Sequence, residues 1–266
     1  MGQGLNTKVA QVCAKVLGIP MELISVKPNM NVVNPNGSAT GGSLGSDMCS
    51  MAAKKACEQL SDRLRPFMAD GKAWLDVIKD ANKANVNLTV HYLQTPVPTP
   101  YNVFVLAAAE VELDVLTGEY RFNRVDMYED AGQSLSPWVD VGQVEGAFVM
   151  GMGLHLFEEY RYDPDTGRKL TDSAWSYFVP SSKDIPTDFR VKLLKNNYNP
   201  VGVFNSKATG EPPLCVTFSC LSALRQAVAA ARKDAGKVNW TQLDAPSTVE
   251  SVQTACQLSV DMFVLS

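Results

Sequence analysis

Histidine is scarce in this sequence, and its cysteines are not spaced as metal ligands usually are. There are 2 histidines and 6 cysteines, and no Cys-x-x-Cys pair occurs. Structural zinc sites and iron–sulfur clusters need closely spaced cysteine and histidine ligands, so this chain alone is not expected to hold either. We expect no metal to be bound directly by side chains, and we interpret the cysteines as reduced core thiols of an intracellular protein. The cysteines are Cys13, Cys49, Cys57, Cys215, Cys220 and Cys256.

Long hydrophobic runs and basic clusters are missing as well. The longest unbroken apolar run, residues 103–109, has seven residues, whereas about 20 are needed to span a bilayer. The net charge is −4 with a pI near 5.3, and no group of Lys and Arg marks a nucleic-acid footprint. The chain begins without a secretory signal, and Asn6 stands where a myristoylation motif needs Ser or Thr. These absences predict a cytoplasmic protein that binds neither membrane nor nucleic acid.

The order of helical and strand patterns indicates the fold class. The 266 residues are 45% hydrophobic and 20% charged, an ordinary globular mix for one or two domains. Helices and strands alternate irregularly, without a repeated strand–helix–strand unit, so the pattern favours an α+β fold over a doubly wound sheet. Thr117-Gly118 predicts a hairpin, and Asp140 is expected to cap a helix. We expect helices to begin near residues 5, 46, 74, 140, 214 and 247, and strands at 23–26, 86–92, 103–116, 119–128 and 189–194.

Four glycine-bearing segments stand at or near the starts of expected helices. They are residues 2–4, 39–43, 142–146 and 209–213. The first turn of a helix carries unpaired N–H groups and a partial positive charge, so it suits phosphates and oxyanions. Four such turns together would form a cradle for an anionic cofactor. For any one of them alone, a simple requirement of the turn is the commoner explanation.

Familiar nucleotide motifs are incomplete. Gly2-x-Gly4 lacks a third glycine and a preceding strand, so it does not make a dinucleotide fingerprint. Residues 146–151 have the glycine spacing of a P-loop, but Met152 stands where the lysine is required. Gly142 and Gly146 are instead interpreted as letting a helix pack closely.

Glu211 is the ionisable residue in the most suggestive setting. Pro212 disfavours the α-helical region for the residue before it, which predicts an extended backbone at Glu211. Pro213 then stands in the first turn of a helix, whose N–H groups would keep a nearby carboxylate ionised, as a general base requires. The alternative is that Glu211 merely complements the helix dipole, and the residues alone favour that alternative.

Five stretches, taken in order, carry a more specific signal. They are residues 1–5 (MGQGL), 40–43 (TGGS), 110–118 (EVELDVLTG), 140–148 (DVGQVEGAF) and 206–214 (SKATGEPPL). Together they resemble the molybdenum-binding C-terminal region of the xanthine dehydrogenase and aldehyde oxidase family. The resemblance covers nearly the whole chain, at least to Arg232. It implies the mixed helices and strands of that family's molybdopterin-binding domain.

The resemblance implies a role for each matching residue. Glu211 corresponds to the general base that deprotonates a molybdenum-bound hydroxyl, whose oxygen attacks the substrate while a hydride passes to a sulfido ligand. Gln143 corresponds to a side chain that hydrogen-bonds near the molybdenum ligands, and Gly2 and Gln3 to the turn at the pterin or its phosphate. The pterin dithiolene would hold molybdenum without a side-chain ligand. The loop beside the metal and pterin corresponds to Gly41, Gly42 and Ser43.

Members of that family are far longer than 266 residues. Residues 1–266 are therefore expected to be part of the second, C-terminal molybdopterin-binding domain, with iron–sulfur, FAD and first molybdopterin-binding portions upstream. The intact protein would be a cytoplasmic homodimer carrying molybdenum-molybdopterin, FAD and two [2Fe-2S] clusters, through which electrons pass.

The resemblance also indicates a substrate class. Residues 129–132 and 199–203 are most similar to invertebrate aldehyde oxidases, which favours oxidation of aldehydes to carboxylic acids, or hydroxylation of N-heterocycles, with oxygen from water. A xanthine dehydrogenase acting on hypoxanthine or xanthine is the alternative. The alternative of another class is a non-catalytic fragment or partner-binding module.

Overall fold

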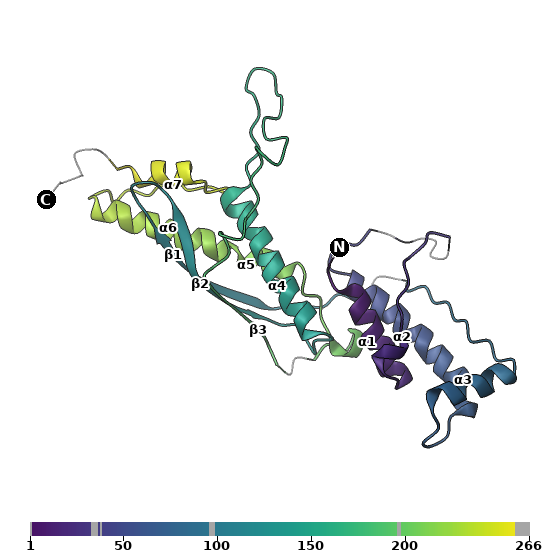
Figure 1. Cartoon of the computed structure of the whole chain (residues 1–266). Helices are drawn as coiled ribbons and strands as arrows, with labels where there is room; N and C mark the ends of the chain where they lie inside the picture. The colour runs from purple at the N-terminus through teal and green to yellow at the C-terminus, as the bar shows by residue number, and fades with distance from the viewer. Residues whose placement is uncertain (1, 33–36, 38, 96–98, 196–197, 259–266) are drawn as a thin grey trace. The chain divides into compact units, whose positions relative to one another are not determined.

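The chain folds into two compact units, each of which is described by itself. The computed structural model describes residues 2–32, 37, 39–95, 99–195 and 198–258 (Figure 1). Helices accompany one small mixed sheet among these residues, so the predicted α+β class is confirmed. Unit 1 comprises Met1–Val103, Ala131–Asp140 and Lys195–Ala208, and unit 2 comprises Phe104–Asp130, Val141–Leu194 and Thr209–Ser266.

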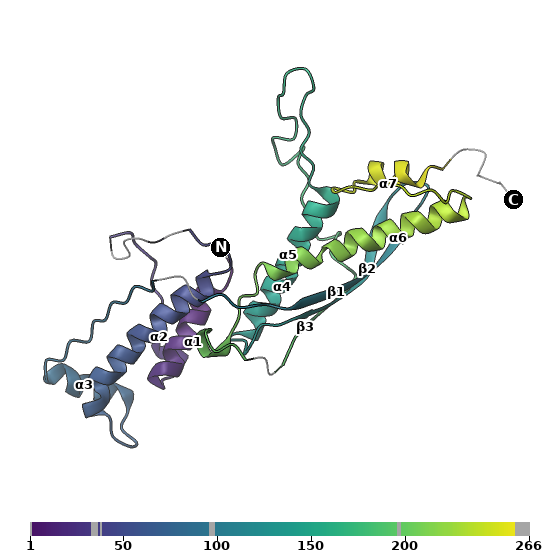
Figure 2. The ribbon, with the colours of Figure 1, turned by 180° about the vertical axis from the view of Figure 1, so that it is seen from behind.

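Unit 1 is built on two helices that lie side by side. These are α1 (Leu5–Leu17) and α2 (Gly45–Leu64), which pack against each other and run together in both ribbon views (Figures 1 and 2). Gly18 ends α1 in the left-handed conformation that suits glycine, and α2 ends just before Pro66. A third helix, α3 (Trp74–Lys83), packs against the end of α2. Short 3₁₀ turns are η1 (Met21–Leu23), η2 (Arg65–Phe67) and η4 (Val203–Asn205).

Unit 2 contains a three-stranded sheet in the order β1-β2-β3. Strands β1 (Val105–Leu113) and β2 (Tyr120–Glu129) form the predicted antiparallel hairpin, and β3 (Asp188–Leu193) pairs with β2 in parallel. Side chains of β1 alternate between half-buried and exposed, as expected for a sheet with one covered face. The helices of this unit are α4 (Pro137–Met152, whose first turn belongs to unit 1), η3 (Gly153–Phe157), α5 (Pro212–Val216), α6 (Phe218–Asp234) and α7 (Val249–Cys256).

The core of unit 2 lies between the covered face of the sheet and its helices. Val125 and Met127 of β2 are buried against Phe148 of α4 and Leu224 of α6. The rings of Phe148 and Phe189 lie 5.4 Å apart between centroids, which ties α4 to β3. Figure 2, in which the molecule is seen from behind, shows α6 running along the sheet. The apolar faces of the helices and of the sheet therefore pack together in one layer.

Several predictions of local structure were wrong. Residues 23–26 and 86–92 form no strand. Val86 and Leu88 instead pack against the small core formed by α2 and α3. Helix α4 begins at Pro137, so Asp140 lies within its first turn and is not its cap. Proline fits the first turn of a helix because its missing N–H would have no partner there.

The interpretations of the cysteines and of one glycine pair also need correction. Cys57, Cys220 and Cys256 are buried, but Cys49 and Cys215 are exposed on their helices, so not every cysteine is a core thiol. Gly142 and Gly146 do not serve close packing, because a Cβ added at either would meet no described atom within 4 Å.

Apolar packing accounts for a long apolar helical run among the described residues. Among the described residues, the run Pro212–Asp234 is the one whose length and hydropathy would allow it to cross a membrane. Within it, α5 and α6 are separated by Thr217. Cys220 and Leu224 of this run are buried in the core of unit 2, and α6 contacts β1. Its apolar residues are therefore those that a helix packed on a sheet requires.

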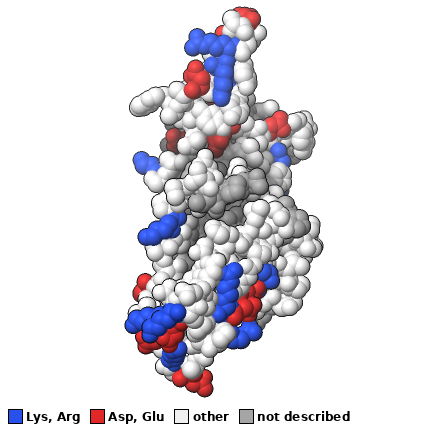
Figure 3. All heavy atoms as spheres, turned by 90° about the vertical axis from the view of Figure 1, so that its right-hand side faces the viewer, with Lys and Arg blue, Asp and Glu red and all other residues white. Residues whose placement is uncertain are grey.

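Charges on the surface are largely arranged as local pairs. Helix α2 carries the pair Lys54–Glu58, and α3 carries Lys79–Asp76, both at helical spacing. On the face drawn in Figure 3, most basic atoms of the described residues lie beside acidic ones, without a broad basic area. Such surface pairs contribute little to stability individually.

A pair of thiols, Cys13 of α1 and Cys57 of α2, lies between these two helices. The Cys57 thiol donates a hydrogen bond to Cys13, and this lowers the pKa of Cys13 from its ordinary value of 9.0 to about 7. Because the thiolate is the nucleophile, we expect the rate of alkylation of Cys13 by iodoacetamide to rise with pH through a midpoint of about 7. Mass-spectrometric mapping of the modified cysteine across pH 5–10 measures it. The Cys57→Ala control should move that midpoint up toward 9.0, and a wild-type midpoint near 9.0 would contradict the contact.

Candidate anion-binding site

The first residues of α1 and α2 are neighbours in unit 1. A Cβ added at Gly45, the first residue of α2, would lie 3.7 Å from the Cδ2 atom of Leu5, the first residue of α1. It would lie 3.3 Å from the Cγ2 atom of Thr40. The two helix starts, and the glycine turns that lead into them, are therefore brought together.

Both turns use backbone conformations that suit glycine. Gly4 has a φ of 74° immediately before α1, and Gly42 has a φ of 63° shortly before α2. Ser43 follows with a φ of 54°, in the same left-handed region, which is uncommon for residues other than glycine. A Cβ at Gly4 would also lie 2.6 Å from both γ-methyl groups of Val139. Position 4 therefore requires glycine for two reasons: the positive φ, and the lack of room for a Cβ atom.

The start of a third helix, α4, lies beside the turn that precedes α1. Val139, which packs on Gly4, belongs to the first turn of α4. The first four N–H groups of a helix have no partner within it and carry the positive end of the helix dipole. Three helix starts in one region of unit 1, with Gly2 and Gly41 exposed in the adjoining turns, suit a phosphate or another oxyanion.

A buried ion pair fixes the start of α4 against α1. The Nζ atom of Lys8 lies 2.5 Å from Oδ1 of Asp140, and the two side chains are 6% and 1% exposed. The hydroxyl of Ser134 donates a hydrogen bond to the other oxygen of the same carboxylate. Because a buried carboxylate is costly without such partners, removing either one would weaken the contact between the two helix starts.

A second buried network holds the first turn of α2. The hydroxyl of Tyr101 donates to Oδ2 of Asp47 at 2.7 Å and accepts a hydrogen bond from the backbone N–H of Ala208 at 2.8 Å. Burial raises the pKa of Asp47, and the hydrogen bond from Tyr101 and the charge of Lys8 oppose that rise. Burial, together with Asp47, raises the pKa of Tyr101. Three distant segments of the chain therefore meet at the Tyr101 hydroxyl.

Lys8, Asp47 and Tyr101 were not predicted from the sequence as residues of this site. Lys8 lies three residues after Leu5 and four before Val12, so it falls within the apolar stripe of α1. Asp47 begins a comparable stripe of buried positions on α2. A charged residue on an apolar stripe was therefore the signal that could have found both. For Tyr101, which follows no periodic pattern, the sequence offered no signal.

The two predicted site residues of unit 2 lie on neighbouring helical segments. Gln143 is half-buried on α4, and Glu211 is exposed immediately before α5. The hydroxyl of Thr217 donates to the carbonyl oxygens of Phe148 in α4, at 3.2 Å, and of Pro213 in α5, at 3.1 Å. These bonds hold α5, and with it the turn that carries Glu211, against α4.

The backbone of Glu211 differs from the prediction. Its φ of −117° and ψ of −31° lie in the α-helical region and not in the extended region. The carbonyl oxygen of Glu211 accepts a hydrogen bond from the N–H of Leu214 at 3.0 Å, which stabilises a turn despite the preference imposed by Pro212. Its side chain makes no capping hydrogen bond to the five-residue helix α5. The carboxylate therefore projects from a turn fixed by backbone bonds.

The predicted site residues thus fall into two groups. Unit 1 brings together the two glycine turns, and unit 2 holds Gln143 and Glu211. No group of three or more His, Cys, Asp or Glu placed to hold a metal is found among the described residues. His91 is exposed outside any strand, and burial together with Arg225 lowers the pKa of half-buried His155. The glycine-turn group consists of Gly2, Gln3, Gly41, Gly42 and Ser43.

Comparison with known proteins gives consistent matches. Residues 1–186 match the model of the molybdopterin cofactor-binding domain family. Over 277 residues the chain is 38% identical to xanthine dehydrogenase/oxidase of Gallus gallus, covering 99% of this chain and 20% of that protein. It is 40% identical over 276 residues to probable aldehyde oxidase 3 of Oryza sativa subsp. japonica, covering 98% and 20%. The chain therefore spans about a fifth of the length of these relatives.

A solved structure shows the same fold. Quinoline 2-oxidoreductase from Pseudomonas putida 86 superposes with a TM-score of 0.80 at 22% sequence identity, covering 96% of this chain and 35% of that one. At this identity the likeness concerns the fold alone.

Proposed function

Because the chain belongs to the molybdopterin cofactor-binding domain family, we propose that the glycine turns of unit 1 bind the anionic pterin cofactor. The observation that carries this proposal is the meeting of the α1 and α2 starts at Leu5 and Gly45. Helix starts attract phosphate groups, and the open turns at Gly2 and Gly41 leave their backbone N–H groups accessible. Gln3 and Ser43 lie in the same turns and are assigned to the same ligand.

The residues of this chain would bind the cofactor and move a proton. When bound, molybdenum-molybdopterin supplies oxygen transfer and two-electron redox chemistry. Gln143 has a side-chain amide that can donate a hydrogen bond to the cofactor's ligands. Glu211 carries an exposed carboxylate on a turn held by Leu214 and Thr217, and it is assigned the role of general base.

For the whole protein, we propose a molybdenum hydroxylase that oxidises aldehydes to carboxylic acids or hydroxylates N-heterocycles. Relatives named as aldehyde oxidase and as xanthine dehydrogenase are 40% and 38% identical, so a xanthine dehydrogenase activity stands as the second candidate. Electrons would leave through FAD and two [2Fe-2S] clusters outside this chain, in a cytoplasmic homodimer. A non-catalytic, partner-binding module is the proposal of another class, and it predicts no bound molybdenum in the purified protein.

A charge placed in the cradle tests the binding proposal. A side chain at Gly41 has open space, and the backbone there is not in the left-handed region. We expect Gly41→Asp in the full-length protein to lower molybdenum and pterin content about tenfold, because the carboxylate opposes an anion at the helix starts. Elemental analysis and the fluorescence of the oxidised pterin measure both contents.

A neutral variant of nearly the same size is the matched control. Gly41→Asn should retain the cofactor, and circular dichroism should show both variants folded. Full cofactor content in Gly41→Asp would refute the assignment of this turn.

A further inference from the structure

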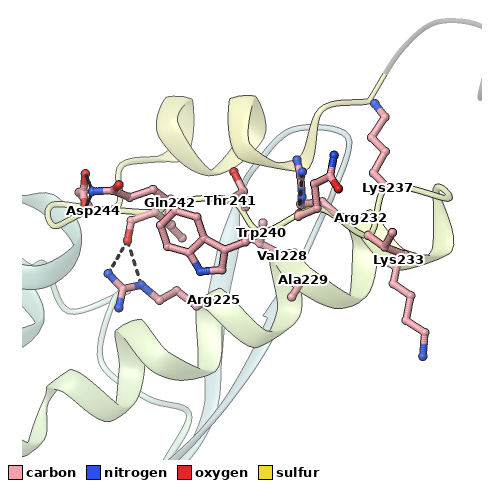
Figure 4. Close-up of a pocket in the computed structure, with 13 residues that line it drawn as sticks. Arg225, Val228, Ala229, Arg232, Lys233, Lys237, Trp240, Thr241, Gln242 and Asp244 are labelled. Atoms are coloured by element: carbon pink, nitrogen blue, oxygen red, sulfur yellow. Dashed lines mark hydrogen bonds between the residues drawn. The ribbon is translucent and has the colours of Figure 1, made fainter.

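A pocket of about 720 Å³ lies in unit 2 between α6 and the segment that follows it. Its size falls within the range of pockets that enclose small organic ligands. Figure 4 shows its wall, which α6 and residues 237–244 supply. None of the residues assigned to the cofactor or to the general base lines it.

One side of the pocket is aromatic and apolar. The side chain of Trp240 is 81% exposed, and its indole lies over α6 near Val228 and Ala229 (Figure 4). Buried tryptophan is the more usual case, since the indole gains much from burial. Here a broad aromatic face beside an apolar floor is left open to a flat ligand.

The rest of the lining is basic. The lining contains four cations, Arg225, Arg232, Lys233 and Lys237, and one acid, Asp244, so its formal charge is +3 in a chain of net charge −4. The Asp244 carboxylate accepts hydrogen bonds from the Gln242 amide at 2.7 and 2.8 Å. The field within the pocket therefore favours an anion, opposite to what the chain as a whole favours.

Among these cations, Arg225 is held in place for binding. Its Nε and Nη2 atoms both donate to the carbonyl oxygen of Leu243, at 2.9 and 2.6 Å, which leaves Nη1 outside that pair of bonds. Arg232 is buried and donates to the carbonyls of Ala255 and Asn239. In Figure 4 the side chains of Lys233 and Lys237 extend away from the indole. Arg225 is therefore the cation fixed beside the open ring.

We propose that this pocket binds a planar aromatic ring bearing a carboxylate or a phosphate. The ring stacks on Trp240, and the anionic group pairs with Arg225. Stacking on an exposed aromatic side chain and pairing with a fixed guanidinium each contribute to affinity, so both parts of the ligand are needed.

Titration calorimetry on the full-length protein tests this proposal with ligands that separate its parts. The probes are 2-naphthoate and adenosine monophosphate, and the partial ligands are acetate, inorganic phosphate and 2-naphthylmethanol. We expect at least one complete probe to bind, and each partial ligand to bind at least about tenfold more weakly. Binding of only one complete probe assigns the anion as carboxylate or as phosphate.

Matched substitutions place that binding in the pocket. Trp240→Ala should weaken the bound probe about tenfold, whereas Trp175→Ala, at a tryptophan 92% exposed outside the lining, should not change its affinity. Arg225→Gln should weaken it comparably, with folding checked by circular dichroism. The proposal is overturned if neither probe binds, if a partial ligand binds equally well, or if Trp240→Ala leaves the affinity unchanged. Cofactor content in Trp240→Ala should stay at the wild-type level, which separates this test from that of the cradle.

Discussion

Replacing Glu211 by glutamine in the full-length protein is expected to lower kcat by about 10²- to 10⁴-fold, the usual contribution of a positioned general base. Glutamine keeps the shape and hydrogen-bonding reach of the side chain but cannot accept the proton. The turn itself should persist, because the hydrogen bond from Leu214 ends on the backbone carbonyl of residue 211. Steady-state oxidation of an aldehyde and of a purine, with molybdenum content measured in parallel, gives the result.

Glu250 provides the matched control for this substitution. It is also an exposed glutamate at a helix start, in the first turn of α7. If Glu211 only complements a helix dipole, then Glu211→Gln and Glu250→Gln should both leave turnover intact and change stability by less than about 1 kcal/mol. A large loss of kcat confined to Glu211→Gln, with molybdenum retained, supports the base. Wild-type turnover in that variant refutes it.

Lys8→Met should have the largest effect on stability. It leaves the carboxylate of Asp140 buried without its cation, and breaking a buried ion pair in this way typically costs about 3–5 kcal/mol. The hydroxyl of Ser134 remains as a hydrogen-bond donor, so the lower half of that range is expected. Urea denaturation followed by circular dichroism measures the loss in free energy of unfolding.

Two further variants separate burial from charge. Lys54→Met removes one of the two lysine partners of the half-buried Glu58 on α2 and should cost no more than about 1 kcal/mol. The double variant Lys8→Met/Asp140→Leu should recover much of the loss, because replacing both charges by apolar groups removes the unpaired carboxylate. Equal effects of Lys8→Met and Lys54→Met would show that the Lys8–Asp140 pair is not buried in solution.

The sequence was most informative where local rules agree with packing. The Thr117-Gly118 hairpin and the helices beginning near residues 5 and 74 follow from periodicity and turn residues, and they are confirmed. Residues 86–92 alternate like a strand but find no partner strand, which only tertiary structure could reveal. The start of α4 was misplaced because Asp140 has the chemistry of a cap, while its carboxylate is engaged by a lysine 132 residues away in the chain.

In the candidate site, too, the local features could be predicted from the sequence and the tertiary ones could not. Glycines and helix starts predicted the turns at residues 2–4 and 41–43, since such turns are local. That these turns adjoin depends on the pairing of α1 with α2, which no short motif encodes. The segment 142–146 shows the limit of glycine as a marker, because it lies inside α4 and not at a helix start.

The adjacency of Leu5 and Gly45 also makes folding and loading thermodynamically linked. An anion that binds only where the two helix starts are joined has no equivalent site on the unfolded chain. At a hundred times its Kd, such a ligand adds about 2.7 kcal/mol to the stability of unit 1. The supply of cofactor in the cell would then set how long this part of the protein survives proteases, as well as whether it is active.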